Sequence, residues 1–200
     1  LPGGPPALVG RITLSGGGFP DAVATLRQDG ARIAGTFDMT PWQVDGGRLA
    51  IESMQFGSAG ARGRATIDGP IGDGRVEGLV VPVDLRLGQA GLVMVNPGCT
   101  PVAFTRLELA GMRLGPTRLP LCAVGGGLFV RDSAGRTGGG GAINGLRLIG
   151  AVGDSPLSIL ARRLSFTVAR FGFTVDQLAI RLGENRLDVA TLDGDSRGGR

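Results

Sequence analysis

The sequence from Leu79 to Gly88 reads Leu-Val-Val-Pro-Val-Asp-Leu-Arg-Leu-Gly and decides the fold class. Its odd-numbered positions from 79 to 87 are all aliphatic, whereas Asp84 and Arg86 occupy the intervening positions. Alternation with a period of two is typical of a β-strand with one buried and one exposed face. Because Pro82 has no backbone N–H, we expect this strand at a sheet edge or with a bulge there.

The same alternation recurs near the C-terminus, where its phase changes twice. Apolar residues occupy even positions in 164–168, odd positions in 171–175 and even positions again in 178–182. Each change of phase requires a bulge or a turn, and the first falls near Arg170 and Gly172.

Turn signals divide the rest of the chain into short segments. Asp29-Gly30 and Asp45-Gly46 predict hairpin turns, and Asp68-Gly69-Pro70 and Glu184-Asn185 predict further connections. We also interpret the glycine runs as turns; they are Gly16–Gly18, Gly46–Gly47, Gly125–Gly127 and Gly138–Gly141. The spacing of these signals predicts roughly twelve to fourteen short strands.

One segment has the signals of a helical turn. Ser155 to Ala161 begins with a serine suited to the N-cap and a proline suited to the first helical position. The sequence therefore predicts an all-β fold, an elongated, curved and mostly antiparallel sheet with at most one short helix.

The composition excludes several classes of chemistry. The 200 residues include no His, Lys or Tyr, so all 21 basic side chains are Arg. Without His there is no Ser-His-Asp or Cys-His system, and without Lys there is no P-loop or Schiff base. Two cysteines cannot form a four-thiolate zinc site. Since 42% of the residues are hydrophobic, we expect a folded protein. Because these residue types are missing, we expect that it is no enzyme and holds no metal or cofactor.

The arginines are spread singly along the chain, and only Arg162 and Arg163 are adjacent among them. The formal net charge of +4 arises in the second half, which has 13 arginines against 8 acidic residues. Nucleic-acid binders interleave clustered basic residues with aromatic ones, so we expect no nucleic-acid partner. The sequence shows neither a transmembrane segment nor a secretory signal at Leu1, so we expect a processed product or a piece of a longer protein.

Cys99 and Cys122 lie 23 positions apart in a segment rich in proline and glycine. They either form a disulfide in an oxidising compartment or remain buried thiols in a reducing one, and their context favours the disulfide. The spacing is not the Cys-x-x-Cys of a catalytic pair. We interpret residues 1–200 as a single β section, with a sub-boundary near 96–125.

The aliphatic surplus of these strands needs a partner, and no helix-rich segment can cover it. Either two sheets pack face to face, or the sheet curls into a trough that stays apolar inside. A trough with arginine at its rim suits acyl chains with anionic headgroups. The alternative is a structural or passenger-type β module with a self-packed core.

From about residue 47 to 194 the chain resembles the AsmA-like envelope proteins of the YdbH type. The most specific part is the two-cysteine block, Asn96-Pro97-Gly98-Cys99 followed by Leu119-Pro120-Leu121-Cys122. The other matching segments are Asp68-Gly69-Pro70, Gly74 to Gly78 with the strand to Gly88, Gly153 to Leu157, and Arg186 to Ala190.

This resemblance implies a taco-shaped β groove that carries phospholipids across the periplasm between the inner and outer membranes. It implies an inner-membrane anchor in the full-length protein, and a small outer-membrane lipoprotein as a further partner. We expect the groove to be lined by aliphatic and aromatic side chains of two segments, namely Leu79, Val81, Val83, Leu85, Leu87, Phe166, Phe171, Phe173, Leu178 and Ile180. A strand phase shifted by one residue would invert this list.

Overall fold

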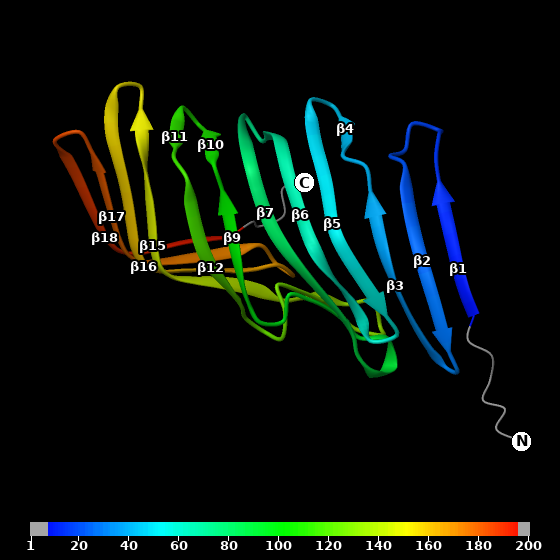
Figure 1. The fold of residues 1–200 in the computed structure, drawn as a ribbon. Coiled ribbons are helices and arrows are strands. Elements are labelled where there is room, and N and C mark those ends of the chain that lie inside the picture. The colour runs from blue at the N-terminus through cyan, green and yellow to red at the C-terminus, as the bar shows by residue number, and fades with distance from the viewer. Residues whose placement is uncertain (1–7, 196–200) are drawn as a thin grey trace, which may run out of the picture.

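The computed structural model describes residues 8–195, which form one antiparallel β-sheet (Figure 1). This range contains 18 strands and no α-helix, and its only helical element is a three-residue 3-10 turn, Gln89–Gly91. The all-β fold class is therefore confirmed. The strands are β1 (Leu8–Leu14), β2 (Ala22–Asp29), β3 (Arg32–Met39), β4 (Trp42–Val44), β5 (Gly47–Gly57), β6 (Gly60–Ile71), β7 (Gly74–Leu87), β8 (Val93–Val95), β9 (Cys99–Phe104), β10 (Arg106–Leu109), β11 (Met112–Leu114), β12 (Thr117–Ala123), β13 (Phe129–Arg131), β14 (Thr137–Gly138), β15 (Gly140–Val152), β16 (Ser155–Thr167), β17 (Gly172–Leu182) and β18 (Asn185–Asp195).

The sheet is mainly a meander in which strands pair with their sequence neighbours. β1, β2, β3, β5, β6 and β7 follow one another in this way, as do β15 to β18. Between these two runs, β10 and β9 pair with β7, while β11 and β12 pair with β15. The Cys-containing segment thus joins the two runs within one sheet.

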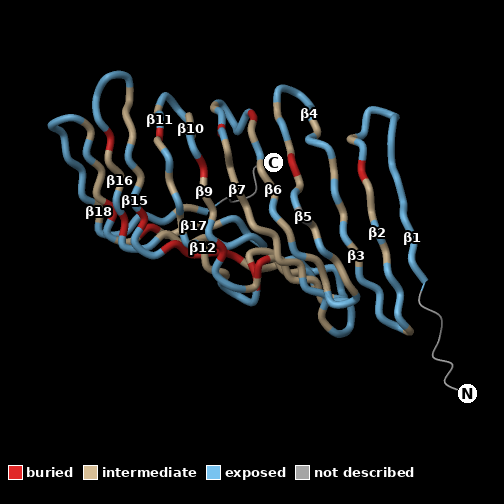
Figure 2. The backbone as a smooth tube through the Cα atoms, viewed as in Figure 1, coloured by how far each residue is buried: buried red, intermediate tan, exposed pale blue. Residues whose placement is uncertain are grey.

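The two faces of the sheet differ in character, and we call the one that carries the buried clusters the inner face. One cluster consists of Ile143, Leu146, Ala161, Val175 and Leu178. The other consists of Val76, Phe104, Leu114 and Leu157. Figure 2 shows that β1 is exposed along its whole length, whereas most buried segments lie in the C-terminal half. The core is therefore confined to part of one face.

The strands β15–β18 bend along a line that crosses all four of them (Figure 1). The ladder of paired residues is interrupted along this line, where the strands place Gly145, Arg162, Gln177 and Ala190 opposite one another. Gly145 and Gln177 have positive φ angles of 69° and 50°. Because two consecutive residues of each strand face outward, the aliphatic residues on both sides of the line share the inner face. The phase change predicted between 175 and 178 is therefore confirmed as a bend.

The helical turn predicted for Ser155 to Ala161 is wrong, because this segment begins strand β16. Leu157, Ile159 and Ala161 alternate with a period of two and are paired with β15 on one side, and the inner-face packing of this row outweighs the capping signal. Pro156 is tolerated at this position because it lies opposite Gly183, in the turn that follows the end of β17. Its carbonyl accepts from Gly183 N–H at 2.9 Å, and its missing N–H costs no hydrogen bond within the β16–β17 ladder.

Other turn predictions were correct only in part. Asp29-Gly30 and Asp45-Gly46 lie at hairpin turns, and Asp45 and Gly46 have φ angles of 49° and 75°. Asp68-Gly69-Pro70 was wrongly predicted as a connection, because it lies inside β6, where the register shifts by one residue. Gly140 and Gly141 likewise belong to β15. The prediction of twelve to fourteen short strands is wrong too, since β7, β15 and β16 each span 13 or 14 residues.

Pro82 lies at a gap in the sheet, as its missing N–H requires. β7 pairs with β9 at Val80 and with β8 from Leu85 onward, so between these points its edge opposite β6 faces no strand. The Asn96 side chain fills this gap. Its amide nitrogen donates to Pro82 O at 2.9 Å, and its amide oxygen accepts from Asp84 N–H at 2.6 Å. A single buried side chain thus replaces a strand at this position.

Candidate functional site

The inner face of β7 contains the first row of candidate groove residues. Leu79 packs against the buried cluster around Phe104, and the register places Val81, Val83 and Leu85 on the same face. Their partners on β6 are small, because Ala65, Gly63 and Ala61 lie directly opposite these three residues. Large aliphatic side chains therefore alternate with small ones across neighbouring strands. Leu87, at the end of the row, is 47% exposed.

The second candidate row lies on β16 and β17. Phe166 and Phe173 face each other across these strands, Leu178 is buried, and Ile180 faces Ile159. Phe171 lies outside the row, in the turn between the two strands, where it is 55% exposed. Its ring centroid is 6.4 Å from that of Phe173.

The two rows belong to one continuous apolar surface. The cluster around Phe104 and Leu157 is contacted by Leu79 from β7 and by Ile180 from β17. These residues are about a hundred positions apart in sequence, and β9 to β12 with β15 and β16 bring them together. The structure therefore places the two predicted rows on the same side of the sheet.

This apolar surface is not closed by any other part of residues 8–195. None of the described side chains is completely buried, and the aliphatic residues at both outer strands of the sheet are exposed on the inner face. On β1 and β18 they are Leu8, Ile12, Leu14, Leu187 and Leu192, which are 43–63% exposed. The chain exposes 12985 Å², against roughly 8,800 Å² for a compact protein of this mass. The sheet therefore does not pack into a closed sandwich.

Phenylalanine is paired with glycine on the inner face. Phe56, Phe166 and Phe173 lie directly opposite Gly35, Gly141 and Gly194 on the neighbouring strands. A Cβ atom added at Gly194 would lie 2.3 Å from Cε1 of Phe173, and one at Gly141 would lie 2.8 Å from Cζ of Phe166. Each ring therefore lies across the bare backbone of its partner glycine.

The outer face is polar and carries ion pairs on β5–β7. Arg48 pairs with Asp68 at 3.5 Å, while Arg62 and Arg86 both contact Asp84, at 3.3 and 2.9 Å. The hydrogen bond from Arg86 is the largest cause that lowers the pKa of Asp84 below its ordinary value of 3.8, and a hydrogen bond from Arg62 acts in the same direction. The same strands thus separate charge and apolar surface onto opposite faces.

Because the pKa of Asp84 is lowered, the free energy of unfolding depends on pH in the acidic range. Because its pKa is lower in the folded chain than in the unfolded one, the carboxylate stabilises the fold above about pH 4, and this contribution is lost as pH falls through the folded pKa. We expect the difference in unfolding free energy between wild type and Asp84→Asn to be constant above about pH 5 and to narrow below about pH 4. Denaturant titrations at several pH values measure it, and curves that stay parallel in acid would contradict it.

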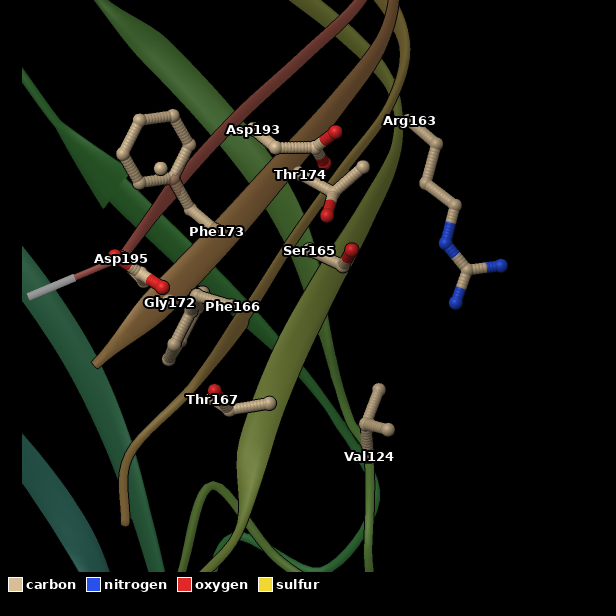
Figure 3. A pocket seen from close by; sticks show the side chains of 11 residues that line it. Val124, Arg163, Ser165, Phe166, Thr167, Gly172, Phe173, Thr174, Asp193 and Asp195 are labelled. Carbon is tan, nitrogen blue, oxygen red and sulfur yellow. The ribbon is translucent and has the colours of Figure 1, made fainter. Parts of the chain in front are cut away.

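One cavity that contains predicted groove residues lies at the ends of β16–β18 and has a volume of about 650 Å³. Figure 3 shows the side chains of Phe166 and Phe173 projecting to one side of these strands, and those of Ser165, Thr174 and Asp193 to the other. The lining residues therefore come from both faces at the ends of these strands, with the aromatic rings on the inner face and the hydroxyl and carboxylate groups on the outer face.

Two further structural findings bear on where and how the chain acts. Cys99 and Cys122 face each other on β9 and β12 and form a disulfide, which indicates a non-reducing compartment. Within residues 8–195 there is no group of three Cys, Asp or Glu side chains placed to hold a metal ion. The same range contains no helix with the length and hydrophobicity needed to span a bilayer.

Sequence reasoning missed Asn96, the phenylalanine–glycine pairs and the openness of both edge strands. Asn96 offers only a weak signal, an asparagine before a proline, because its partners lie 12 and 14 positions away. The glycine pairs depend on the exact register between two strands, which the alternation within each strand does not fix.

Comparison with known proteins adds no relative. No protein-family model matches the chain, and no curated protein or solved structure matches it.

Proposed function

We propose that this chain carries phospholipid in a groove formed by its inner face, across the periplasm between the inner and outer membranes and without covalent chemistry. The observation that carries the proposal is the aliphatic face of the 18-stranded sheet, which is left uncovered at both edge strands. Acyl chains need such a surface because burying their apolar area away from water contributes roughly 25 cal/mol per Å² to the free energy of binding. The headgroups would remain in water. Because no covalent chemistry is involved, lipid would move passively, down its own concentration gradient.

Two other features support this proposal. The disulfide fits an extracytoplasmic compartment, of which the periplasm is one. The sequence resemblance to the AsmA-like envelope proteins supplies phospholipid as the cargo, the two membranes as endpoints and a small outer-membrane lipoprotein as a partner. An inner-membrane anchor would belong to the full-length protein.

A structural or passenger-type module is the second candidate. The observation that favours it is the pair of buried clusters, which shows that the middle of the inner face packs against itself. In that case the exposed aliphatic residues at the edge strands would contact protein rather than lipid.

Extraction of bound lipid separates the two candidates. We expect the protein, purified mildly from bacterial envelope, to release phospholipid into organic solvent, as measured by mass spectrometry. Val83→Asp with Leu85→Arg should abolish this lipid, because two charges on the inner face would have to be desolvated by acyl chains. Val9→Asp with Thr13→Arg is the matched control, because it places the same charges on the outer face of β1.

A second variant guards against misfolding. Ile12→Asp with Leu187→Arg introduces charges at inner-face positions that are already 57% and 55% exposed, so the fold should persist while lipid is lost. A folded wild-type protein that is free of lipid, under conditions where a known carrier retains it, would contradict the proposal. The structural-module candidate would then lead.

A further inference from the structure

The outer face of β15–β17 combines exposed aliphatic side chains with arginines. Ile149 and Leu160 are 47% and 40% exposed, although they lie on the polar side of the sheet. Arg147 lies directly opposite Leu160, and Arg181 lies opposite Ser158, whose other partner is Ile149. Arg162 is the next outward residue of β16 after Leu160. We call these five residues, Ile149, Leu160, Arg147, Arg162 and Arg181, the basic aliphatic patch.

The arginines of this patch are not neutralised by ion pairs. Within the described part of the chain, the ion pairs closer than 4.0 Å do not include Arg147, Arg162 or Arg181. On the side of the bend that carries the patch, Asp188 is the outward acidic side chain of these strands, whereas Asp176 and Asp193 lie on the other side of the bend. Asp188 is bonded by Arg186 at 2.7 Å and also feels the charge of Arg181, and Asp176 lies opposite Arg163. On the patch side of the bend, Arg147, Arg181 and Arg186 therefore outnumber Asp188, and the outer face keeps an excess of positive charge there.

The patch differs in this respect from the outer face of β5–β7. There, Arg48, Arg62 and Arg86 are each held by an aspartate. Arg64 of β6 is also outside these ion pairs, so the patch is distinguished by having its arginines beside the exposed aliphatic side chains Ile149 and Leu160.

We propose that the basic aliphatic patch rests on the surface of an anionic phospholipid bilayer. Guanidinium groups bind phosphate oxygens in a bidentate manner, and they remain charged at every pH that a membrane meets. Ile149 and Leu160 are placed to enter the interfacial region between the bound headgroups, as the apolar side chains of peripheral membrane proteins do. This contact uses the opposite face from the groove, so it does not rest on the proposed function.

Vesicle flotation of the whole chain tests this contact. We expect binding to vesicles of phosphatidylglycerol and phosphatidylethanolamine at low salt, weaker binding at high salt, and little binding to phosphatidylcholine alone. Arg147→Gln with Arg181→Gln should weaken binding about 5-fold for each arginine, hence about 25-fold together. The matched control is Arg27→Gln with Arg64→Gln, which removes the same charge from the outer faces of β2 and β6 and should bind like wild type.

A second pair of variants isolates the aliphatic contribution. Ile149→Ser with Leu160→Ser should lower affinity about tenfold at a salt concentration that screens the arginines. Val83→Asp with Leu85→Arg alters only the inner face and should leave vesicle binding unchanged, which separates this result from the lipid-extraction result. Equal affinity for phosphatidylcholine, or equal losses in the Arg27/Arg64 and Arg147/Arg181 variants, would overturn the proposal.

Discussion

Replacement of Cys99 and Cys122 by serine is expected to lower the free energy of unfolding by about 3 kcal/mol, because the disulfide closes a loop of 23 residues in the unfolded chain. The loss should be large for this protein, since its core is confined to two clusters on one face. Both cysteines lie at directly opposite positions of β9 and β12, the strands that connect the two runs of the meander. The disulfide thus fastens the middle of the sheet.

Urea titrations of the oxidised wild type and of the double serine variant measure this difference. Wild type titrated in the presence of a reductant is the control, and its midpoint should move to that of the variant. Equal midpoints for the oxidised and reduced protein would contradict the prediction.

Replacement of Asn96 by alanine is expected to cost roughly 3 kcal/mol, because two backbone groups of β7 lose their partners. The side chain is 3% exposed and satisfies both Pro82 C=O and Asp84 N–H. A buried polar group left unsatisfied costs about 1–3 kcal/mol. Asn96 also has a φ of 47°, a conformation that asparagine tolerates better than alanine.

Thermal and urea unfolding of Asn96→Ala measure this cost. Asn144→Ala is the matched control, because Asn144 is an exposed strand residue of β15 and its replacement should change stability by no more than about 0.5 kcal/mol. An Asn96→Ala variant as stable as this control would show that water replaces the amide in the gap.

Much of the fold could be predicted from alternation alone. The period of two at 79–87 gave the correct strand, and the phase change between Val175 and Leu178 correctly required an irregularity, which is the bend at Gln177. Ser155-Pro156 was misleading because capping is a local signal of about 1 kcal/mol. In this segment the capping signal competes with the burial of Leu157 and Ala161, and the local sequence does not reveal that burial.

The alternation placed the predicted residues on one face, except Phe171, which lies in a turn, but it could not give the continuity between the two rows. Each row follows from the alternation of its own strand, whereas the contact of Leu79 and Ile180 with one cluster depends on four intervening strands. The disulfide could be favoured from context because two cysteines allow a single pairing. The basic aliphatic patch could not be predicted, since Ile149 and Leu160 break the alternation of their own strands.

The rings laid across glycines affect how evenly the inner face is built. A phenylalanine ring that pointed straight out of the sheet would rise above the neighbouring leucine and valine side chains, and a glycine beside it would leave a hollow. Because each ring lies over the bare backbone of its partner glycine, the height of the ring and the hollow at the glycine offset each other. For an apolar chain sliding over this face, the corrugation of the surface sets the friction. In the lipid-carrying function that we propose, a side chain at Gly194 would push against the Phe173 ring and is expected to slow the movement of lipid more than it lowers the amount bound.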